Sequence, residues 1–130
     1  AVFKLYPMIY GAEANGYSEL LSLRSSSSLT FNAGATVASL DATIRGFERA
    51  TDISSVEALT DDGEPAFDLD VTIAANGEID MSEAASPAGA DLSMKGFISA
   101  DGKMMVLRFY GYETVGTEMH ELGMIIGIRQ

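Results

Sequence analysis

The chain contains no cysteine, no tryptophan and only one histidine among its 130 residues. The absence of cysteine excludes disulfides, thiolate metal sites and cysteine nucleophiles. With no thiolate and a single imidazole, a tetrahedral zinc site built on nitrogen and sulfur is excluded as well. The protein therefore cannot be stabilised by disulfides or by such a zinc site, and it cannot use a thiol in catalysis.

Positive charge is also scarce. Eight Lys and Arg residues stand against nineteen Asp and Glu residues, which gives a formal net charge of −11. Such a surface is repelled by phosphate backbones and by anionic membrane faces, and the basic residues form no stripe, so we expect no nucleic-acid partner. The longest apolar run, 122–128 with its glycines, is far short of the roughly 20 residues of a membrane helix, so no membrane span is expected.

Sequence signatures of common enzymes are missing too. The chain has no Gly-x-Ser-x-Gly elbow, no Walker loop and no dinucleotide fingerprint. We therefore predict a protein that is not an enzyme and that needs no cofactor.

What remains is the composition of an ordinary globular protein. Hydrophobic residues make up 47% and charged residues 21% of the chain, and its length suits a single domain over residues 1–130. The sequence opens with Ala1, without an initiator Met or a charged-then-apolar leader. We expect either a mature form after signal removal or a piece of a longer protein, and we favour a bacterial secreted (periplasmic or extracellular) or envelope protein.

Alternation of apolar and polar residues dominates the second half. In 67–73, apolar residues at odd positions alternate with Asp68, Asp70 and Thr72, and Asn76-Gly77 then forms the strongest short hairpin signal. Asp101-Gly102 joins two further apolar runs, and 60–65 has the composition of a third turn. The pattern predicts an antiparallel meander.

The first half is less regular. We expect strands over 2–10, with Pro7 at an edge or a bulge, and over 17–24 and 28–31 around a polar serine turn. We interpret 36–49 as strand rather than helix, 82–91 as a loop and 119–129 as the final strand, and 53–59 as a candidate short helix. Glycines at 46, 96, 111, 123 and 127 lie inside strand patterns, as at barrel corners. The predicted fold class is all-β: a meander of roughly eight strands that closes into a barrel, or a β-sandwich, with at most one short helix.

The segment Lys103–Glu113 is apolar on both sides. Odd positions form one apolar face, whereas the other face carries Met104, Val106, Arg108, Tyr110 and Tyr112. The predicted final strand, 119–129, is also apolar on both sides. Each of these two strands therefore needs other residues to cover both of its faces. The second face could be covered by a helix or the N-terminal segment. It could instead meet a second copy or a neighbouring domain, or it could line an apolar ligand cavity with Arg108, Tyr110 and Tyr112 at its polar end.

Acidic residues crowd the third turn. Hard carboxylate oxygens suit calcium, although the spacing does not match an EF-hand loop. The competing interpretation is a solvated face that resists edge pairing, and a hydrolase using Asp68 and Asp70 is a further alternative. The candidate calcium ligands are Asp61, Asp62, Glu64, Asp68 and Asp70.

Two other groups suggest chemistry at first sight. His120 lies between Glu118 and Glu121, and we interpret it as a solvated residue at a strand end rather than a general base. Seven methionines suggest Cu(I), but methionine is also an ordinary core filler, which is the interpretation we prefer. The sequence thus predicts a binding or assembly domain that contacts protein, itself or a neighbouring domain, through an apolar-aromatic strand face. The alternative is a barrel that carries a small apolar ligand.

Overall fold

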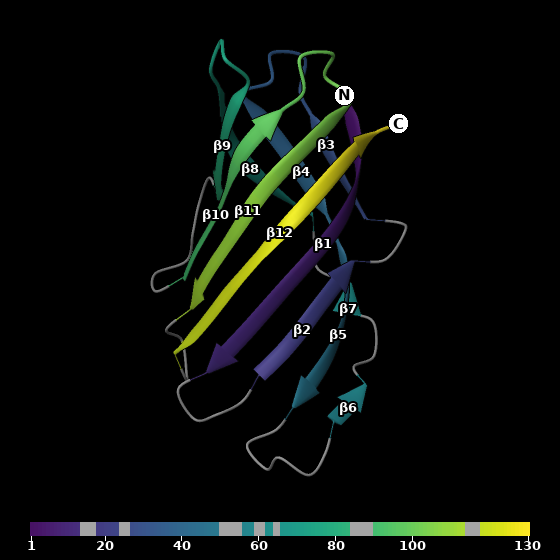
Figure 1. Ribbon diagram of the computed structural model, residues 1–130, viewed down its shortest axis with the longest axis vertical. Coiled ribbons are helices and arrows are strands. Elements are labelled where there is room, and N and C mark those ends of the chain that lie inside the picture. Colours follow the sequence, from purple (N-terminus) through teal and green to yellow (C-terminus); the bar gives the residue numbers. More distant parts are fainter. Residues whose placement is uncertain are drawn as a thin grey trace.

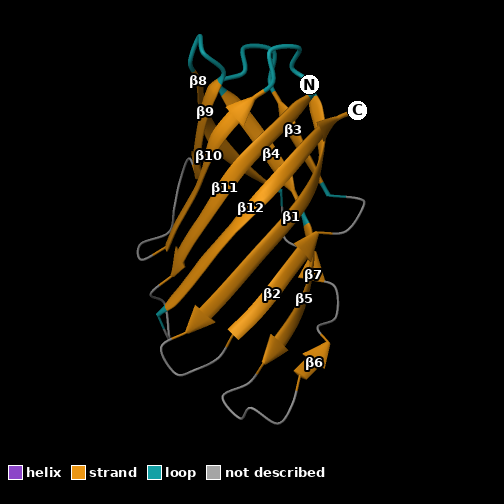
Figure 2. Ribbon diagram, viewed as in Figure 1, coloured by secondary structure: helices purple, strands orange, loops and turns teal. Residues whose placement is uncertain are grey.

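In a computed structural model of the chain, the described residues are 1–13, 18–23, 27–49, 56–58, 62–63, 66–83, 90–113 and 118–130. They form strands and turns and contain no helix (Figures 1 and 2). The strands are β1 (Val2–Glu13), β2 (Ser18–Leu23), β3 (Ser28–Phe31), β4 (Val37–Asp41), β5 (Thr43–Arg49), β6 (Val56–Ala58), β7 (Asp62–Gly63), β8 (Phe67–Ile73), β9 (Glu78–Glu83), β10 (Ala90–Ile98), β11 (Met104–Glu113) and β12 (Met119–Arg129).

These strands close into an antiparallel barrel. Eight of them follow one another around the ring in the order β12-β11-β10-β9-β8-β4-β3-β1, and β1 pairs with β12 to complete it. The closing ladder runs from the pair Phe3–Arg129 to the pair Glu13–Met119, so the two termini lie side by side at one end of the barrel (Figure 1). The barrel alternative is therefore correct and the sandwich alternative is not.

Strands β2 and β5 extend β3 and β4, respectively, beyond the ring. The first part of β1 pairs with β3 and its later part with β2, while β4 is followed after one residue by β5, which pairs with β2. Thus β2 with β3, and β4 with β5, each act as one long strand with a break. At the break the buried Ser27 hydroxyl accepts a hydrogen bond from the Thr43 N–H at 2.9 Å and lies 3.4 Å from the Thr43 carbonyl. The Ser27 hydroxyl thereby supplies hydrogen-bond partners for Thr43 backbone groups at the point where the strand pairing is interrupted.

The hairpin signals are confirmed. Gly77 has a φ of 85° and Gly102 a φ of 65°, the left-handed region that glycine adopts at little cost. In the first of these turns the Ala74 N–H donates to the Glu78 carbonyl at 2.8 Å. In the second, the Ser99 N–H donates to the Met104 carbonyl, also at 2.8 Å. These turns set the registers of β8–β9 and β10–β11.

Gly96 and Gly123 lie where neighbouring strands approach most closely. A Cβ on Gly96 would lie against the Val106 carbonyl oxygen, and a Cβ on Gly123 against the Met8 carbonyl oxygen and the Ile9 Cα. Glycine thus lets adjacent backbones crowd together as the sheet curves, the role that the sequence predicted for glycines within strands.

The interior of the barrel is filled by side chains. Phe3 and Phe31 meet edge to face with ring centroids 5.6 Å apart. Among the described residues, the large side chains with less than 2% exposure are all apolar: Phe3, Leu29, Leu69, Ile79, Met81, Met94, Met105, Leu107 and Ile125. Ser27 is the one buried polar residue of the described chain. The inward face is therefore a packed core.

Four local expectations need correction. Val56–Ala58, in the middle of the candidate helix 53–59, is strand β6, because the chain pairs with β5 there. Asp62–Gly63 pairs with β5 as strand β7 instead of forming a turn. Pro7 lies in neither an edge strand nor a described bulge. It lies in a strand with partners on both sides, beside the interruption between β2 and β3. There its missing N–H is tolerated. Ser27, expected in the polar serine turn, is held in the barrel by its hydrogen bond from Thr43, whereas Ser28 begins β3 as predicted.

Other expectations are confirmed in their described parts. Segment 36–49 is strand on both sides of Ala42, and 119–129 is one continuous strand. The predicted loop 82–91 is shorter, because its outer residues belong to β9 and β10; residues 84–89 lie outside the described residues.

Candidate interaction face

The two sides of β11 have opposite environments. Met105, Leu107 and Phe109 point into the barrel and are buried, whereas the neighbouring Met104 is 46% exposed and Val106 is 37% exposed. The second apolar side of this strand therefore faces outward, into solvent.

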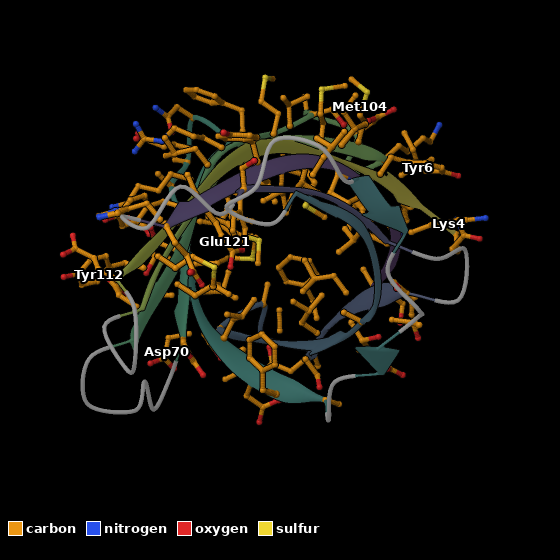
Figure 3. The ribbon with its side chains drawn as sticks, turned by 90° about the horizontal axis from the view of Figure 1, so that it is seen from below. Lys4, Tyr6, Asp70, Met104, Tyr112 and Glu121 are labelled. Carbon is orange, nitrogen blue, oxygen red and sulfur yellow. The ribbon has the colours of Figure 1, made fainter. Side chains whose placement is uncertain are left out.

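The same holds for the strands beside it. In β12, Ile125 is buried while Met124 is 58% exposed. In β1, Ile9 is buried while Met8 is 72% exposed. Seen along the barrel axis (Figure 3), Tyr6 and Met104 project from one side of the ring, and Glu121 projects into the interior.

Register joins these outward side chains into rows across the strands. Phe97 of β10 pairs with Val106, which pairs with Ile126, which pairs with Tyr6 of β1. A second apolar row lies further along the strands and ends on Leu20 of β2. We call the whole set the apolar face: Val2, Tyr6, Met8, Tyr10, Leu20, Phe97, Met104, Val106, Leu122, Met124, Ile126 and Ile128.

The apolar face is larger than a monomer usually exposes. The twelve side chains have exposed fractions of 37–72%. With the full area of an aromatic side chain, about 150–250 Å², as the upper scale, they together expose on the order of 1,000 Å². The largest apolar patch on a typical monomer is about 300–600 Å². One partner in a standard protein–protein interface contributes about 800 Å². The apolar face is therefore of interface size.

The other side of the ring is polar and acidic. Asp70 projects from it, opposite Met104 (Figure 3). At the boundary with the apolar face, the Lys95 ammonium lies 2.6 Å from the Asp80 carboxylate in an exposed ion pair. The outward side chains of β4, β8 and β9 are Val37, Ser39, Asp41, Asp68, Asp70, Thr72, Glu78, Asp80 and Ser82. The described surface is thus divided lengthwise into an apolar half and an acidic half.

The predicted binding residues lie together on the apolar side. Met104, Val106, Arg108, Tyr110 and Tyr112 occupy alternate positions of β11 and all point outward. The N-terminal segment does not cover them, because it is strand β1 and extends the same face. The inward positions between them belong to the core, and of the five only Tyr112 is among the lining residues of a described recess, the one that also contains Phe109 and Glu121.

Sequence reasoning missed half of this face. It did not assign Tyr6, Met8 and Tyr10 of β1, although these alternate with the buried Phe3, Leu5 and Ile9. The signal was the one already noticed in β11 and β12, a strand that is apolar on both sides. It was obscured because Pro7 suggested an interrupted strand.

The candidate calcium ligands are only partly described. Asp68 and Asp70 point outward from β8 and are exposed, and Asp62 lies in β7, whose side chains are not described. Asp61 and Glu64 lie outside the described residues. In the described ranges no three His, Asp or Glu side chains gather in a way that could hold a metal ion. The calcium and hydrolase alternatives stay predictions.

His120 lies near the start of β12, two residues before Leu122 of the apolar face. Its Nε2 lies 2.8 Å from Glu118 Oε1, and its ring centroid is 4.8 Å from that of Tyr112. All three side chains are at least partly exposed. The methionines nearby point in different directions, since Met104 and Met124 are outward and Met105 is in the core. These methionines do not converge on one point with His120.

Recesses occur at the two ends of the barrel. The recess near the termini has a volume of about 250 Å³, with Phe3, Phe31, Ile98 and Arg129 among its lining residues. The recess at the other end measures about 150 Å³ and is lined in part by Phe109 and Glu121. Both lie at the mouths, outside the packed centre.

The fold and this surface define a class: a closed, eight-stranded antiparallel barrel with one apolar outer side. No protein-family model matches the chain, and neither a curated protein nor a solved structure gives a significant match. Across the described ranges there is no helix with the length and apolarity needed to cross a membrane.

Proposed function

We propose that this chain is a non-catalytic binding or assembly domain that contacts another protein through the apolar face. The observation that carries the proposal is the area of that face. Covering on the order of 1,000 Å² of apolar surface releases roughly 25 kcal/mol before the costs of association are subtracted. Leaving it in water forgoes that free energy.

The composition of the face supports protein contact. Cores of protein–protein interfaces are enriched in Tyr, Phe, Met and Arg and depleted in Lys, Glu and Asp. Tyr6, Met8 and Tyr10 of the apolar face have this character, and so do Arg108 and Tyr110, which point outward from β11 beside it. The carboxylates of the outward strand positions stand mainly on the acidic side, around β8 and β9.

The closed ladder determines how a partner would bind. Both β1 and β12 pair on both sides, so neither offers a free edge to an added strand. Contact at this face is therefore made by side chains that a rigid sheet holds in place, which keeps the ordering cost of binding low.

A carrier of a small apolar ligand is supported less well. Its interior would need an apolar space with a few converging polar groups, usually of about 300–1,000 Å³. The inward side chains instead fill the centre, and the recess at the terminal end measures about 250 Å³.

Site-specific photo-crosslinking tests the proposal. A benzophenone side chain is placed at Met8 on the apolar face and, as the matched control, at Asp68 on the acidic side. The labelled protein is irradiated alone and in an extract of its source cells. Protein adducts are expected at position 8 and not at position 68. Equal labelling at both positions, or none at position 8, would contradict the proposal.

A further inference from the structure

A recess opens at the end of the barrel where the two termini meet. Three turns surround this end: 32–36 between β3 and β4, 74–77 between β8 and β9, and 99–103 between β10 and β11 (Figure 1). The buried rings of Phe3 and Phe31 form the floor of the recess, and Ile73 and Ile98 are also among its lining residues. The recess is therefore an apolar cup of about 250 Å³ that is open to solvent.

Backbone hydrogen bonds hold the three turns in place. The Thr36 carbonyl accepts from an N–H of β8 at 2.9 Å, and the Gly77 carbonyl accepts from an N–H of β10 at 2.8 Å. At the third turn, the Lys103 carbonyl accepts from the Arg129 N–H at 2.8 Å. Each turn is thus fixed to another strand of the barrel. The shape of the cup exists before any ligand binds, which lowers the ordering cost of binding.

One wall of the cup has an unfavourable backbone conformation. Ala35 has a φ of 52°, and it is the one described residue other than glycine with a positive φ. A side chain makes this left-handed region less favourable than it is for glycine. Ala35 packs against the core and lines the recess, so a glycine there would relieve the backbone but remove a methyl group from the wall. Backbone strain of this kind is concentrated at ligand and active sites.

The rim of the cup carries an unpaired positive charge. Arg129 lines the recess, and within the described residues its guanidinium has no hydrogen bond or ion pair. Asp101, the one acidic residue of the three turns, instead accepts a hydrogen bond from Ser99 at 2.7 Å and lies 3.6 Å from the Lys103 ammonium. Gly102 adds no side chain beside the guanidinium, since a Cβ there would lie 3.7 Å from Arg129 Nη1. The guanidinium is therefore open to a ligand.

The recess at the opposite end of the barrel has the reverse charge. Its described lining residues include Glu83, Asp91 and Glu121 and neither Lys nor Arg. An anion is repelled from that end and attracted to the terminal one. The two ends of the barrel thus differ in the sign of the ligand that they suit.

We propose that the cup binds a small apolar monocarboxylate, whose apolar part lies on Phe3 and Phe31 and whose carboxylate meets the Arg129 guanidinium. A planar guanidinium matches a carboxylate through two parallel N–H···O bonds. A cavity of about 150 Å³ takes up benzene, so the 250 Å³ of the cup has room for roughly ten non-hydrogen atoms by the same ratio. Phenylacetate has this size and both chemical parts. The cup lies on the inner side of the barrel wall and the apolar face on the outer side, so this inference goes beyond the proposed function and does not depend on it.

Backbone amide chemical shifts in a titration with phenylacetate test the inference. The neutral 2-phenylethanol and the cationic 2-phenylethylamine share its ring and serve as controls. Phenylacetate is expected to bind with a dissociation constant on the order of 1 mM. Both controls should bind at least about fivefold more weakly, because they lack the charged partner of the guanidinium. The shifts should be concentrated in the three turns and at the terminal ends of β1 and β12.

Three variants locate the site and the charge. Arg129→Gln should weaken phenylacetate binding to the level of 2-phenylethanol and leave the affinity for the alcohol unchanged. Ile73→Asp adds a carboxylate to the wall and should weaken phenylacetate binding at least about fivefold. Thr72→Asp adds the same charge one residue away, on the outer side of β8, and should bind phenylacetate as the wild type does. Circular dichroism checks folding, and Arg129→Gln carries the test if Ile73→Asp does not fold.

Several results would overturn the inference. Equal affinities for phenylacetate and 2-phenylethanol, or undiminished phenylacetate binding by Arg129→Gln, would exclude recognition of the carboxylate by this guanidinium. Shifts concentrated in the middle of β11 and β12 would place the ligand on the apolar face. No shifts up to about 20 mM would mean that the cup does not bind this class of ligand. Crosslinking at position 8 tests the proposed function separately and should be the same with and without phenylacetate.

Discussion

Tyr6 and Ile126, from opposite ends of the chain, are register partners on the outer side of the barrel. Both are more than 40% exposed, although one is aromatic and the other aliphatic. Their contact exists because β1 closes the ring against β12. The same closure places the outward side chains of β1 beside those of β11 and β12, and so creates one apolar face from separate segments.

The two sides of β11 should respond differently to truncation. Met105→Ala should lower the free energy of unfolding by about 2–5 kcal/mol, because it opens a cavity in the core. Met104→Ala, its exposed neighbour, should cost less than about 1 kcal/mol. Urea denaturation measures both. Equal losses would mean that both sides of this strand are core.

Gly96 should not tolerate a methyl group. Gly96→Ala places Cβ against the Val106 carbonyl oxygen, and the forced backbone shift should cost about 1–3 kcal/mol. Gly34→Ala is the control, because its Cβ would lie 3.7 Å from the Thr36 hydroxyl, an ordinary contact. The control should change stability by no more than about 0.5 kcal/mol. A Gly96→Ala protein as stable as the control would show that β10 and β11 are further apart than described.

Ser27→Ala should weaken the break between β2 and β3. The substitution removes the acceptor of the Thr43 N–H in a buried position, and a buried backbone donor without a partner costs about 1–3 kcal/mol. Ser82→Ala, on the exposed side of β9, serves as the control and should have little effect. Thermal unfolding monitored by circular dichroism compares the two. An unchanged midpoint for Ser27→Ala would contradict the bridging role of this hydroxyl.

The turn between β10 and β11 should lose stability in acid. The Ser99 hydroxyl, which donates to Asp101 at 2.7 Å, and then the Lys103 backbone N–H hold the pKa of the Asp101 carboxyl below its ordinary value of 3.8. A lowered pKa in the folded state means that the ionised carboxylate stabilises the fold above the unfolded-state pKa. This contribution disappears as the pH falls through the folded-state pKa.

Asp101→Ala should therefore lower the free energy of unfolding at pH 7, and the difference from wild type should shrink in acid. Ser99→Ala should remove part of the same effect, so that the two losses are not additive. Urea titrations of both single variants and the double variant, at a series of pH values, measure this. Additive losses that do not change with pH would rule out the coupling.

Much of the fold could be predicted from local pattern. Alternation in 67–73, the glycines at 77 and 102, and the absence of long helical periods require antiparallel hairpins, because side-chain direction in a strand and left-handed turns depend only on neighbouring residues. The two faces of β11 and β12 were predicted for the same reason. The charge of −11 and the lack of cysteine were likewise properties of composition alone.

Only the tertiary structure decided where the second apolar side of these strands would lie. The alternating pattern predicts that a strand has two different faces. Which of these faces lies inside depends on how the sheet closes and on which side chains fill its centre. The pairing of β1 with β12 joins residues that no local rule connects, and it brings Tyr6, Met8 and Tyr10 into the apolar face. Closure is a long-range event driven by burial of the whole core, and for that reason it could not be predicted from any single segment.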